Sequence, residues 1–285
     1  MASSLPRRVG VAAVGIPLAF GLVYLGEWPL VIALQGLALL GTAELYRLAA
    51  PLGVRALAVS GLLGAVLAPV VLWGLVEGNG LVTTWGGYAA ILWLLATLAA
   101  AVWRRAPDER PLDAAAITVL GVLYAALLPS FVVVLRHTVP DAPPWPATWL
   151  VFLPLAITWI CDSMAMAGGA LIGGAQCAPV ISPNKTWAGT VTGSLSAVVA
   201  AILYGMLVLD RVGTHLPWWQ LATMGLVLSV VGQLGDLAES LFKRAAGVKD
   251  SGTVFPGHGG VLDRLDSLYW VLPISALMLT VFGVL

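Results

Sequence analysis

The chain has 285 residues, of which 60% are hydrophobic and only 10% are charged, and its mean hydropathy is +0.96. Ordinary soluble domains carry about 25% charged residues, so the composition excludes a soluble globular protein and predicts an integral membrane protein. Lys and Arg together number 14, as do Asp and Glu, and this zero net charge gives no reason to expect nucleic acid as a partner.

Apolar stretches recur along the whole chain, and nine of them are candidate transmembrane helices. A hydrocarbon core of ~30 Å requires about 20 residues of helix. We therefore predict an all-α, polytopic membrane protein with about nine transmembrane helices. The candidate segments are Val9–Leu25, Trp28–Ala49, Val54–Val76, Trp85–Trp103, Leu112–Leu135, Trp149–Ile172, Thr186–Leu209, Trp218–Phe242 and Asp266–Leu285.

The basic residues between these segments are distributed unequally between the two sides of the membrane. Alternate connections on one side hold twelve of the 14 Lys and Arg residues, and those on the other side hold only Arg136 and Arg211. Cytoplasmic connections carry the excess of Lys and Arg. We therefore predict a multi-pass protein of the inner (plasma) membrane, with its N-terminus in the cytoplasm and its C-terminus outside.

One carboxylate lies inside an apolar segment in the middle of the chain, and a helix start is expected after it. Asp162 has apolar residues on both sides, and a carboxylate within a membrane helix indicates a functional residue because its isolated burial is costly. Ser182 is expected to cap the next helix, which places Lys185 and Thr186 near its start. Free backbone N–H groups beside a lysine favour the binding of an anion.

The run from Gly232 to Asp266 is the most highly charged part of the chain. It contains nine Asp, Glu, Lys and Arg residues, and it also holds His258 among glycines. Carboxylates bind a hard cation, Lys and Arg neutralise phosphate oxygens, and glycines let the backbone approach a ligand closely. This mixture predicts a magnesium–phosphate site. Its charged members are Asp236, Glu239, Lys243, Arg244, Lys249, Asp250, Asp263, Arg264 and Asp266.

The spacing within this run brings several of these charges together. Asp236, Glu239 and Lys243 follow one another at i, i+3 and i+7, so they share one face of a helix. Asp263 and Asp266 repeat the i, i+3 spacing on the next helix. The loop between the two helices is rich in glycine and suits close approach to a ligand.

The polar positions of the run resemble the signature of phosphatidate cytidylyltransferases (CDP-diacylglycerol synthases). The resemblance covers the C-terminal half well, whereas the first ~110 residues match the family only as apolar helices. We therefore expect N-terminal transmembrane helices over residues 1–110 and catalytic transmembrane helices over residues 111–285, in one membrane-embedded unit. The matching residues are Ser240, Lys243, Arg244, Lys249, Asp250, His258, Gly259, Gly260, Asp263, Arg264 and Asp266, with Asp162, Ser182, Lys185 and Thr186 upstream.

The resemblance implies transfer of a cytidylyl group from CTP to phosphatidic acid, giving CDP-diacylglycerol and pyrophosphate in phospholipid biosynthesis. It also implies Mg²⁺ held by Asp236 and Asp263, and a second cation would suit the same chemistry. The catalytic set is completed by Lys243, Lys249 and Asp250. Residues expected to bind the substrates or orient ligands are Asp162, Ser182, Lys185, Thr186, Glu239, Ser240, Arg244, His258, Gly259, Gly260, Arg264 and Asp266.

Two other functions remain open from the sequence. A CTP-dependent polyprenol or phytol kinase would share a magnesium–nucleotide site, but its alcohol acceptor would attack the γ-phosphorus and favour a general base. A secondary transporter would place its charges near mid-membrane and show repeat symmetry, whereas most charges here lie at one interface. The sequence leaves the oligomeric state open, with a homodimer as one option.

Overall fold

Long apolar runs fold as helices because lipid offers no partners to backbone N–H and C=O groups, which a helix satisfies internally. The computed structural model describes residues 5–137, 143–254 and 259–285, with side chains from residue 13 onward. Seven helical segments in this part of the chain are long and apolar enough to cross a membrane. The predicted all-α, polytopic membrane fold is therefore confirmed. The segments are Glu27–Leu52, Ala58–Val76, Gly80–Arg104, Pro111–His137, Pro144–Ile172, Trp187–Val212 and Trp218–Ala245.

All nine predicted segments contain helix, but the first and the last are not among these seven spans. In α1 (Leu5–Leu25), the apolar part with described side chains is only Ala13–Leu25. The last helix, α11 (Leu268–Val281), has 14 residues, which is about 21 Å of helix against a hydrocarbon core of ~30 Å. The number of membrane crossings and the cytoplasmic N-terminus stay predictions.

The chain folds as two compact units, each formed by two separate stretches of sequence. Unit 1 comprises Met1–Thr138 and Phe242–Leu265, and unit 2 comprises Val139–Leu241 and Asp266–Leu285. One long helix, α9 (Trp218–Ala245), contributes residues to both. The predicted division at residue 110 was based on sequence resemblance, and it stays a prediction.

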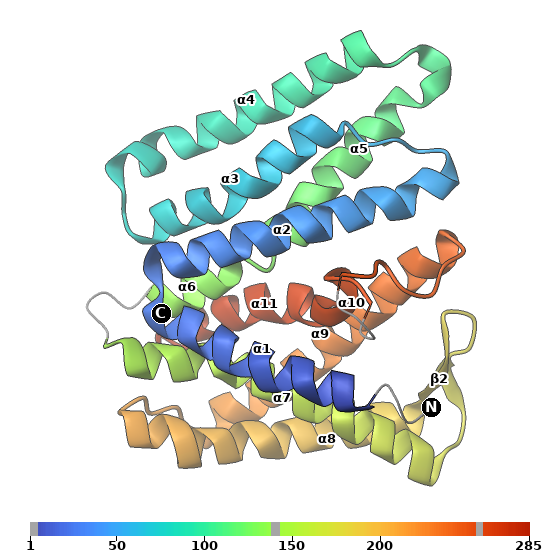
Figure 1. The fold of residues 1–285 in the computed structure, drawn as a ribbon. Helices are drawn as coiled ribbons and strands as arrows, with labels where there is room; N and C mark the ends of the chain where they lie inside the picture. The colour runs from blue at the N-terminus through green and yellow to red at the C-terminus, as the bar shows by residue number, and fades with distance from the viewer. Residues whose placement is uncertain (1–4, 138–142, 255–258) are drawn as a thin grey trace. The chain divides into compact units, whose positions relative to one another are not determined.

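Unit 1 is a layer of helices tied together by buried polar contacts. Helix α2 (Glu27–Ala49) packs against α3 (Ala58–Val76), and α3 packs against α4 (Gly80–Arg104), as Figure 1 shows. The Tyr46 hydroxyl donates to the Thr118 carbonyl (2.8 Å), which ties α2 to α5. The other elements of unit 1 are α1, η1 (Ala50–Leu52), η2 (Pro107–Glu109), α5 (Pro111–Gly121), the π-helical η3 (Val122–Leu127), α6 (Phe131–His137), the end of α9 and α10 (Leu262–Leu265).

The connections between the helices of unit 1 lie alternately at its two ends, as the charge pattern predicts. At one end, Arg105 donates to the Arg55 carbonyl (3.0 Å), so the connections after α2 and α4 lie together. At the other end, ligand atoms of Glu27, Glu77 and His137 lie within 4.8 Å of one another. The Glu27 backbone N–H donates to His137 Nε2 (3.1 Å), so this ring nitrogen is already engaged within the protein.

Unit 2 contains a closely packed helix pair. A Cβ atom added at Gly189 would lie 2.6 Å from the Ala165 carbonyl oxygen, and one at Gly193 would lie 2.8 Å from that of Cys161. These glycines let α8 (Trp187–Tyr204) approach α7 (Pro144–Ile172) closely, as small residues do between membrane helices. The other elements of unit 2 are β1 (Gln176–Ala178), β2 (Ser182–Thr186), the π-helical η4 (Gly205–Leu209), η5 (Asp210–Val212), most of α9, and α11.

The helix expected to start at Ser182 starts later. Ser182–Thr186 form strand β2, which pairs antiparallel with β1. Thr186 has extended backbone geometry and its hydroxyl accepts the Gly189 N–H (3.1 Å), so it is the N-cap of α8. The prediction of a Ser182 cap was wrong, because Thr186 lies nearer the apolar run and also supplies a capping hydroxyl.

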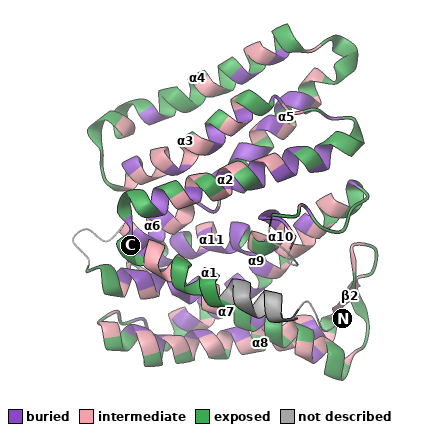
Figure 2. Cartoon of the chain, viewed as in Figure 1, coloured by how far each residue is buried: buried purple, intermediate pink, exposed green. Residues whose placement is uncertain are grey.

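The surface of the spanning helices is apolar. Figure 2 shows that α4 is largely exposed, and only 17% of its most apolar stretch is buried within the protein. Leu92 and Leu95 are among its exposed side chains. Such a large exposed apolar surface suits contact with lipid tails.

Candidate active site

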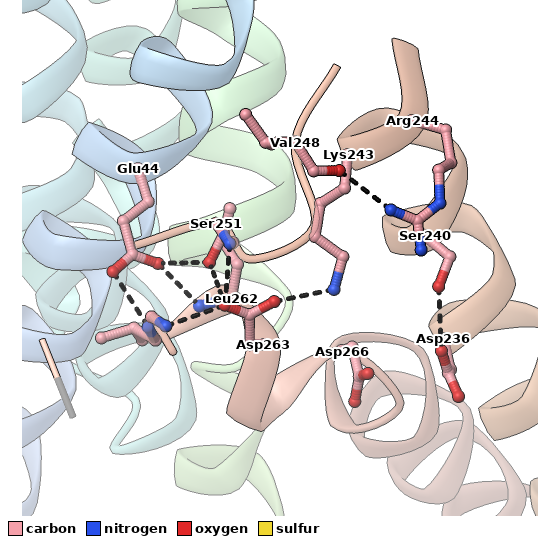
Figure 3. A network of polar contacts seen from close by, with 12 residues as sticks. Glu44, Asp236, Ser240, Lys243, Arg244, Val248, Ser251, Leu262, Asp263 and Asp266 are labelled. Atoms are coloured by element: carbon pink, nitrogen blue, oxygen red, sulfur yellow. Dashed lines mark hydrogen bonds and ion pairs between the residues drawn. The ribbon is translucent and has the colours of Figure 1, made fainter. Parts of the chain in front are cut away.

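Lys243 and Asp263 form a largely buried ion pair in unit 1. The Lys243 ammonium lies 2.7 Å from Asp263 Oδ1, and the side chains are 12% and 5% exposed, respectively. Lys243 projects from the last turns of α9, and Asp263 lies in the short helix α10. Figure 3 shows the two side chains pointing toward each other.

The second oxygen of Asp263 is held by three donors from two loop positions. Oδ2 accepts the backbone N–H of Ser251 (2.8 Å) and of Gly260 (2.8 Å), and it lies 2.9 Å from the Ser251 hydroxyl. Burial raises the pKa of Asp263, but the hydrogen bonds from Lys243 and from the two backbone N–H groups outweigh it, so the pKa lies below its ordinary value. Asp263 is therefore ionised and fixed in orientation at neutral pH.

The other charged residues of this loop are more exposed. The Arg244 guanidinium donates to the Val248 carbonyl (3.0 Å), which closes the turn after α9. Lys249, Asp250 and Arg264 are all exposed, so their charges are accessible to a ligand. The predicted site residue His258 lies outside the described residues.

In unit 2, Lys185 pairs with Asp236. The ammonium lies 2.7 Å from Asp236 Oδ2, and the side chains are 25% and 32% exposed. The other carboxylate oxygen, Oδ1, accepts the Ser240 hydroxyl one helical turn later (3.3 Å). Lys185 comes from strand β2 and Asp236 from α9, so the hairpin brings the cation to the helix.

Two further carboxylates lie in unit 2. Asp162 on α7 is close enough to Asp266, Asp236 and Lys185 to interact electrostatically with all three. Asp266 follows α10 directly, and its carboxylate accepts the Ser267 N–H (2.7 Å). Three carboxylates are therefore grouped with a single lysine, which favours the binding of a further cation.

The structure places the remaining predicted residues as follows. Glu239 lies on α9 with Asp236 and Lys243, as the spacing predicted, and its side chain is fully buried. Asp263 and Asp266 do not share a helix as expected, since α10 ends at Leu265. Ser182 was expected to cap the helix and to bind substrate, and it lies in β2.

Two residues that hold the loop were missed in the sequence. Glu44 on α2 is 1% exposed and accepts hydrogen bonds from the loop that carries Asp263. Ser251 lies between Glu44 and Asp263 (Figure 3). Glu44, like Asp162, is a carboxylate inside an apolar segment, and such a carboxylate indicates a functional residue.

Comparison with known proteins identifies the family of the chain. The model of the cytidylyltransferase family matches residues 6–282. A phosphatidate cytidylyltransferase of Brucella abortus is 37% identical over 211 residues, which are 74% of this chain and 71% of that protein. Those of Staphylococcus epidermidis and Rickettsia bellii are 44% identical over 129 and 128 residues, or 45% and 44% of this chain and 48% and 55% of theirs. The resemblance seen in the sequence is thus confirmed, and the chain belongs to the cytidylyltransferase family.

Proposed function

We propose that this chain transfers a cytidylyl group from CTP to phosphatidic acid, giving CDP-diacylglycerol and pyrophosphate in phospholipid biosynthesis. The family match over residues 6–282 carries the proposal, and the name shared by its curated relatives, phosphatidate cytidylyltransferase, specifies the acceptor. The reaction suits a polytopic membrane protein, because the lipid acceptor stays in the bilayer while CTP arrives from water.

In this reaction a phosphate oxygen of phosphatidic acid attacks the α-phosphorus of CTP. The bond from this phosphorus to the oxygen that bridges the α- and β-phosphates breaks, and pyrophosphate leaves with that oxygen. The lipid phosphate is already ionised near neutral pH, so no side chain has to remove a proton from it. The protein must instead bring two anions together in line and neutralise their charge.

The lysines of the two ion pairs are suited to this task. Lys185 and Lys243 are each oriented by a carboxylate at 2.7 Å, so their ammonium groups are fixed before substrate arrives. We assign them to phosphate oxygens, together with the exposed Arg244, Lys249 and Arg264. We expect Ser182, Thr186, Ser240 and Gly259 to supply neutral donors, whereas Gly260 acts through its N–H bond to Asp263. Glu239 and Asp250 are assigned to orienting the groups around them.

The carboxylates also fit the Mg²⁺ ion that the family implies. Carboxylate oxygens are the side-chain ligands that magnesium prefers, and unit 2 groups three carboxylates with the single Lys185. Asp236 and Asp263 would hold the ion, with a second cation suited to the remaining carboxylates. When bound, Mg²⁺ supplies charge neutralisation at phosphate oxygens.

We further propose that the site faces the cytoplasm from the inner membrane, as the distribution of Lys and Arg predicts. A cysteine at the exposed Thr253, in a chain with Cys177 replaced by serine, should react with an impermeant maleimide only from the cytoplasmic side. A cysteine at Gly80, where an added Cβ meets open space, should react only from outside. Reaction of both from one side would contradict this topology. The homodimer stays a prediction.

Labelled CTP tests the reaction itself. With purified protein, phosphatidic acid and Mg²⁺, label on the α-phosphate should enter the lipid fraction, and label on the γ-phosphate should appear only in pyrophosphate. Diacylglycerol and a polyprenol, offered in place of phosphatidic acid, should remain unlabelled. Transfer of the γ-phosphate to either alcohol, with CDP released, would instead establish the kinase.

A further inference from the structure

The loop that carries Asp263 is attached to helix α2 by one buried carboxylate. Glu44 Oε1 accepts the backbone N–H of Val261 (3.0 Å), and Oε2 accepts that of Leu262 (2.9 Å). These donors lie more than 200 positions away in the sequence, next to Asp263. Glu44 is 1% exposed and both backbone donors belong to fully buried residues, so water does not compete for these bonds.

Ser251 links the same carboxylate to Asp263. Its hydroxyl oxygen lies 3.0 Å from Glu44 Oε2 and 2.9 Å from Asp263 Oδ2. A serine hydroxyl has one proton, so at any moment it donates to one of these oxygens. The two carboxylates are thus joined through a single side chain, and displacement of Glu44 changes what Asp263 contacts.

Two glycines make room for this arrangement. A Cβ atom at Gly252 would lie 2.6 Å from Glu44 Oε1, and a Cβ at Gly260 would collide with Glu44 Oε2 and the Ser251 hydroxyl. Any larger residue at either position would push the loop away from α2. The loop backbone is therefore shaped around the Glu44 carboxylate.

We propose that Glu44 is a positioning residue for Asp263: it fixes Ser251 and residues 260–262 so that the Ser251 and Gly260 N–H groups and Lys243 hold the Asp263 carboxylate in its reactive orientation. This inference rests on the proposed function, which assigns Asp263 to the reaction. Glu44 itself touches no reacting atom. Its contribution is the geometry of the group that does.

Replacement of Glu44 by glutamine gives a specific test, because it keeps the shape of the side chain. Each Glu44 oxygen accepts a backbone N–H. In Gln one of these oxygens is replaced by an NH₂ group, which cannot accept, so one backbone N–H loses its hydrogen bond. We expect the backbone amides of Ser251, Gly260, Val261 and Leu262, which donate to Glu44 or Asp263, to exchange with deuterium at least about tenfold faster than in the parent chain, with kcat lowered roughly 10- to 100-fold.

Thr42→Val is the matched control on the same helix. Thr42 is also fully buried and donates one hydrogen bond, but to the Gly121 carbonyl (3.2 Å) rather than to the loop. It should leave the exchange of these four amides and kcat within about twofold of the parent chain. Ser251→Ala, which keeps the bonds from Val261 and Leu262 to Glu44, should have a smaller effect on exchange than Glu44→Gln and lower kcat by about fivefold.

Unchanged exchange of the Ser251, Gly260, Val261 and Leu262 amides in folded Glu44→Gln would overturn the proposal. If Glu44→Gln does not fold, Ser251→Ala decides: a kcat equal to that of Thr42→Val would overturn it equally. Exchange is measured without CTP or lipid. A chain that positioned its loop through Glu44 but transferred no cytidylyl group would therefore contradict the proposed function and leave this inference standing.

Discussion

The two lysine–aspartate pairs have the same length but very different surroundings. Lys243–Asp263 is nearly buried, and three further donors from Ser251 and Gly260 surround the carboxylate. Lys185–Asp236 is about a quarter to a third exposed, and the carboxylate has one further donor, Ser240. Both distances are 2.7 Å, so distance alone does not distinguish them.

The difference in burial indicates that one carboxylate is fixed in place and that the other can change its partners. Breaking a buried pair costs about 3–5 kcal/mol, because one charge is left without its partner. An exposed pair contributes about 0–1 kcal/mol. Asp263 therefore stabilises the structure in addition to its proposed role in the chemistry, whereas Asp236 is able to change partners when substrate enters. The following changes test this distinction.

The largest effect is expected for Asp263→Asn. It removes a negative charge that is proposed to hold Mg²⁺ and leaves the Lys243 ammonium facing an amide. We expect kcat to fall by about a thousandfold or more, equivalent to about 4 kcal/mol of transition-state stabilisation. We also expect the free energy of unfolding to fall by about 3 kcal/mol. Transfer of label from CTP measures kcat, and thermal unfolding in the same detergent measures the loss of stability. Normal turnover would remove Asp263 from the site.

Asp236→Asn should lower activity without a comparable loss of stability. Its activity should fall as far as that of Asp263→Asn, because the same kind of charge is lost. Its free energy of unfolding should change by less than about 1 kcal/mol, since the pair is partly exposed. Equal destabilisation by the two substitutions would show that the pairs do not differ as their burial indicates.

Acid should weaken the buried pair in a defined pH range. The pKa of folded Asp263 lies below its ordinary value of 3.8, so ionisation stabilises the folded state above that value and this contribution is lost as the pH falls through the folded pKa. The difference in melting temperature between the parent chain and Asp263→Asn should be constant from pH 7 to about pH 5 and shrink below about pH 4. A difference that grows on acidification would mean that the pKa is raised.

The smallest effect is expected for Lys249→Ala, which tests the exposed cations of the same loop. Loss of one phosphate contact should raise the KM for CTP or lower kcat by about fivefold, equivalent to about 1 kcal/mol. Arg55→Ala is the control, because Arg55 is also exposed and is assigned no role in the site. If both variants lose the same activity, general positive charge rather than a phosphate contact explains the result.

The apolar pattern predicted the helices well because the membrane leaves the backbone few other options. Interruptions were less visible. Residues 112–135 were expected as one helix, but α5 gives way to a π-helical stretch and the chain turns at Pro129 before α6. Proline within an apolar run was the available signal.

The composition of the run predicted which residues form the candidate site, but not which of them contact one another. The spacing correctly placed Asp236 and Lys243 on one helix, yet seven residues of helix rise about 10 Å. Each residue therefore pairs elsewhere: Asp236 with Lys185, and Lys243 with Asp263. These pairings, and the contact of Glu44 with the loop, depend on tertiary packing between segments that are far apart in the sequence. Helical periodicity describes only residues within one helix.

The two glycines beside Glu44 also limit how this protein can be engineered for stability. Exchanging glycine for alanine commonly stabilises a protein by about 0.4–1 kcal/mol, by restricting the unfolded chain, wherever the folded backbone accepts a methyl group. Gly36 in α2 meets nothing within 4 Å and is a suitable target. At Gly252 and Gly260 the same exchange would strike the Glu44 carboxylate, so a thermostabilisation library should leave these two codons unchanged.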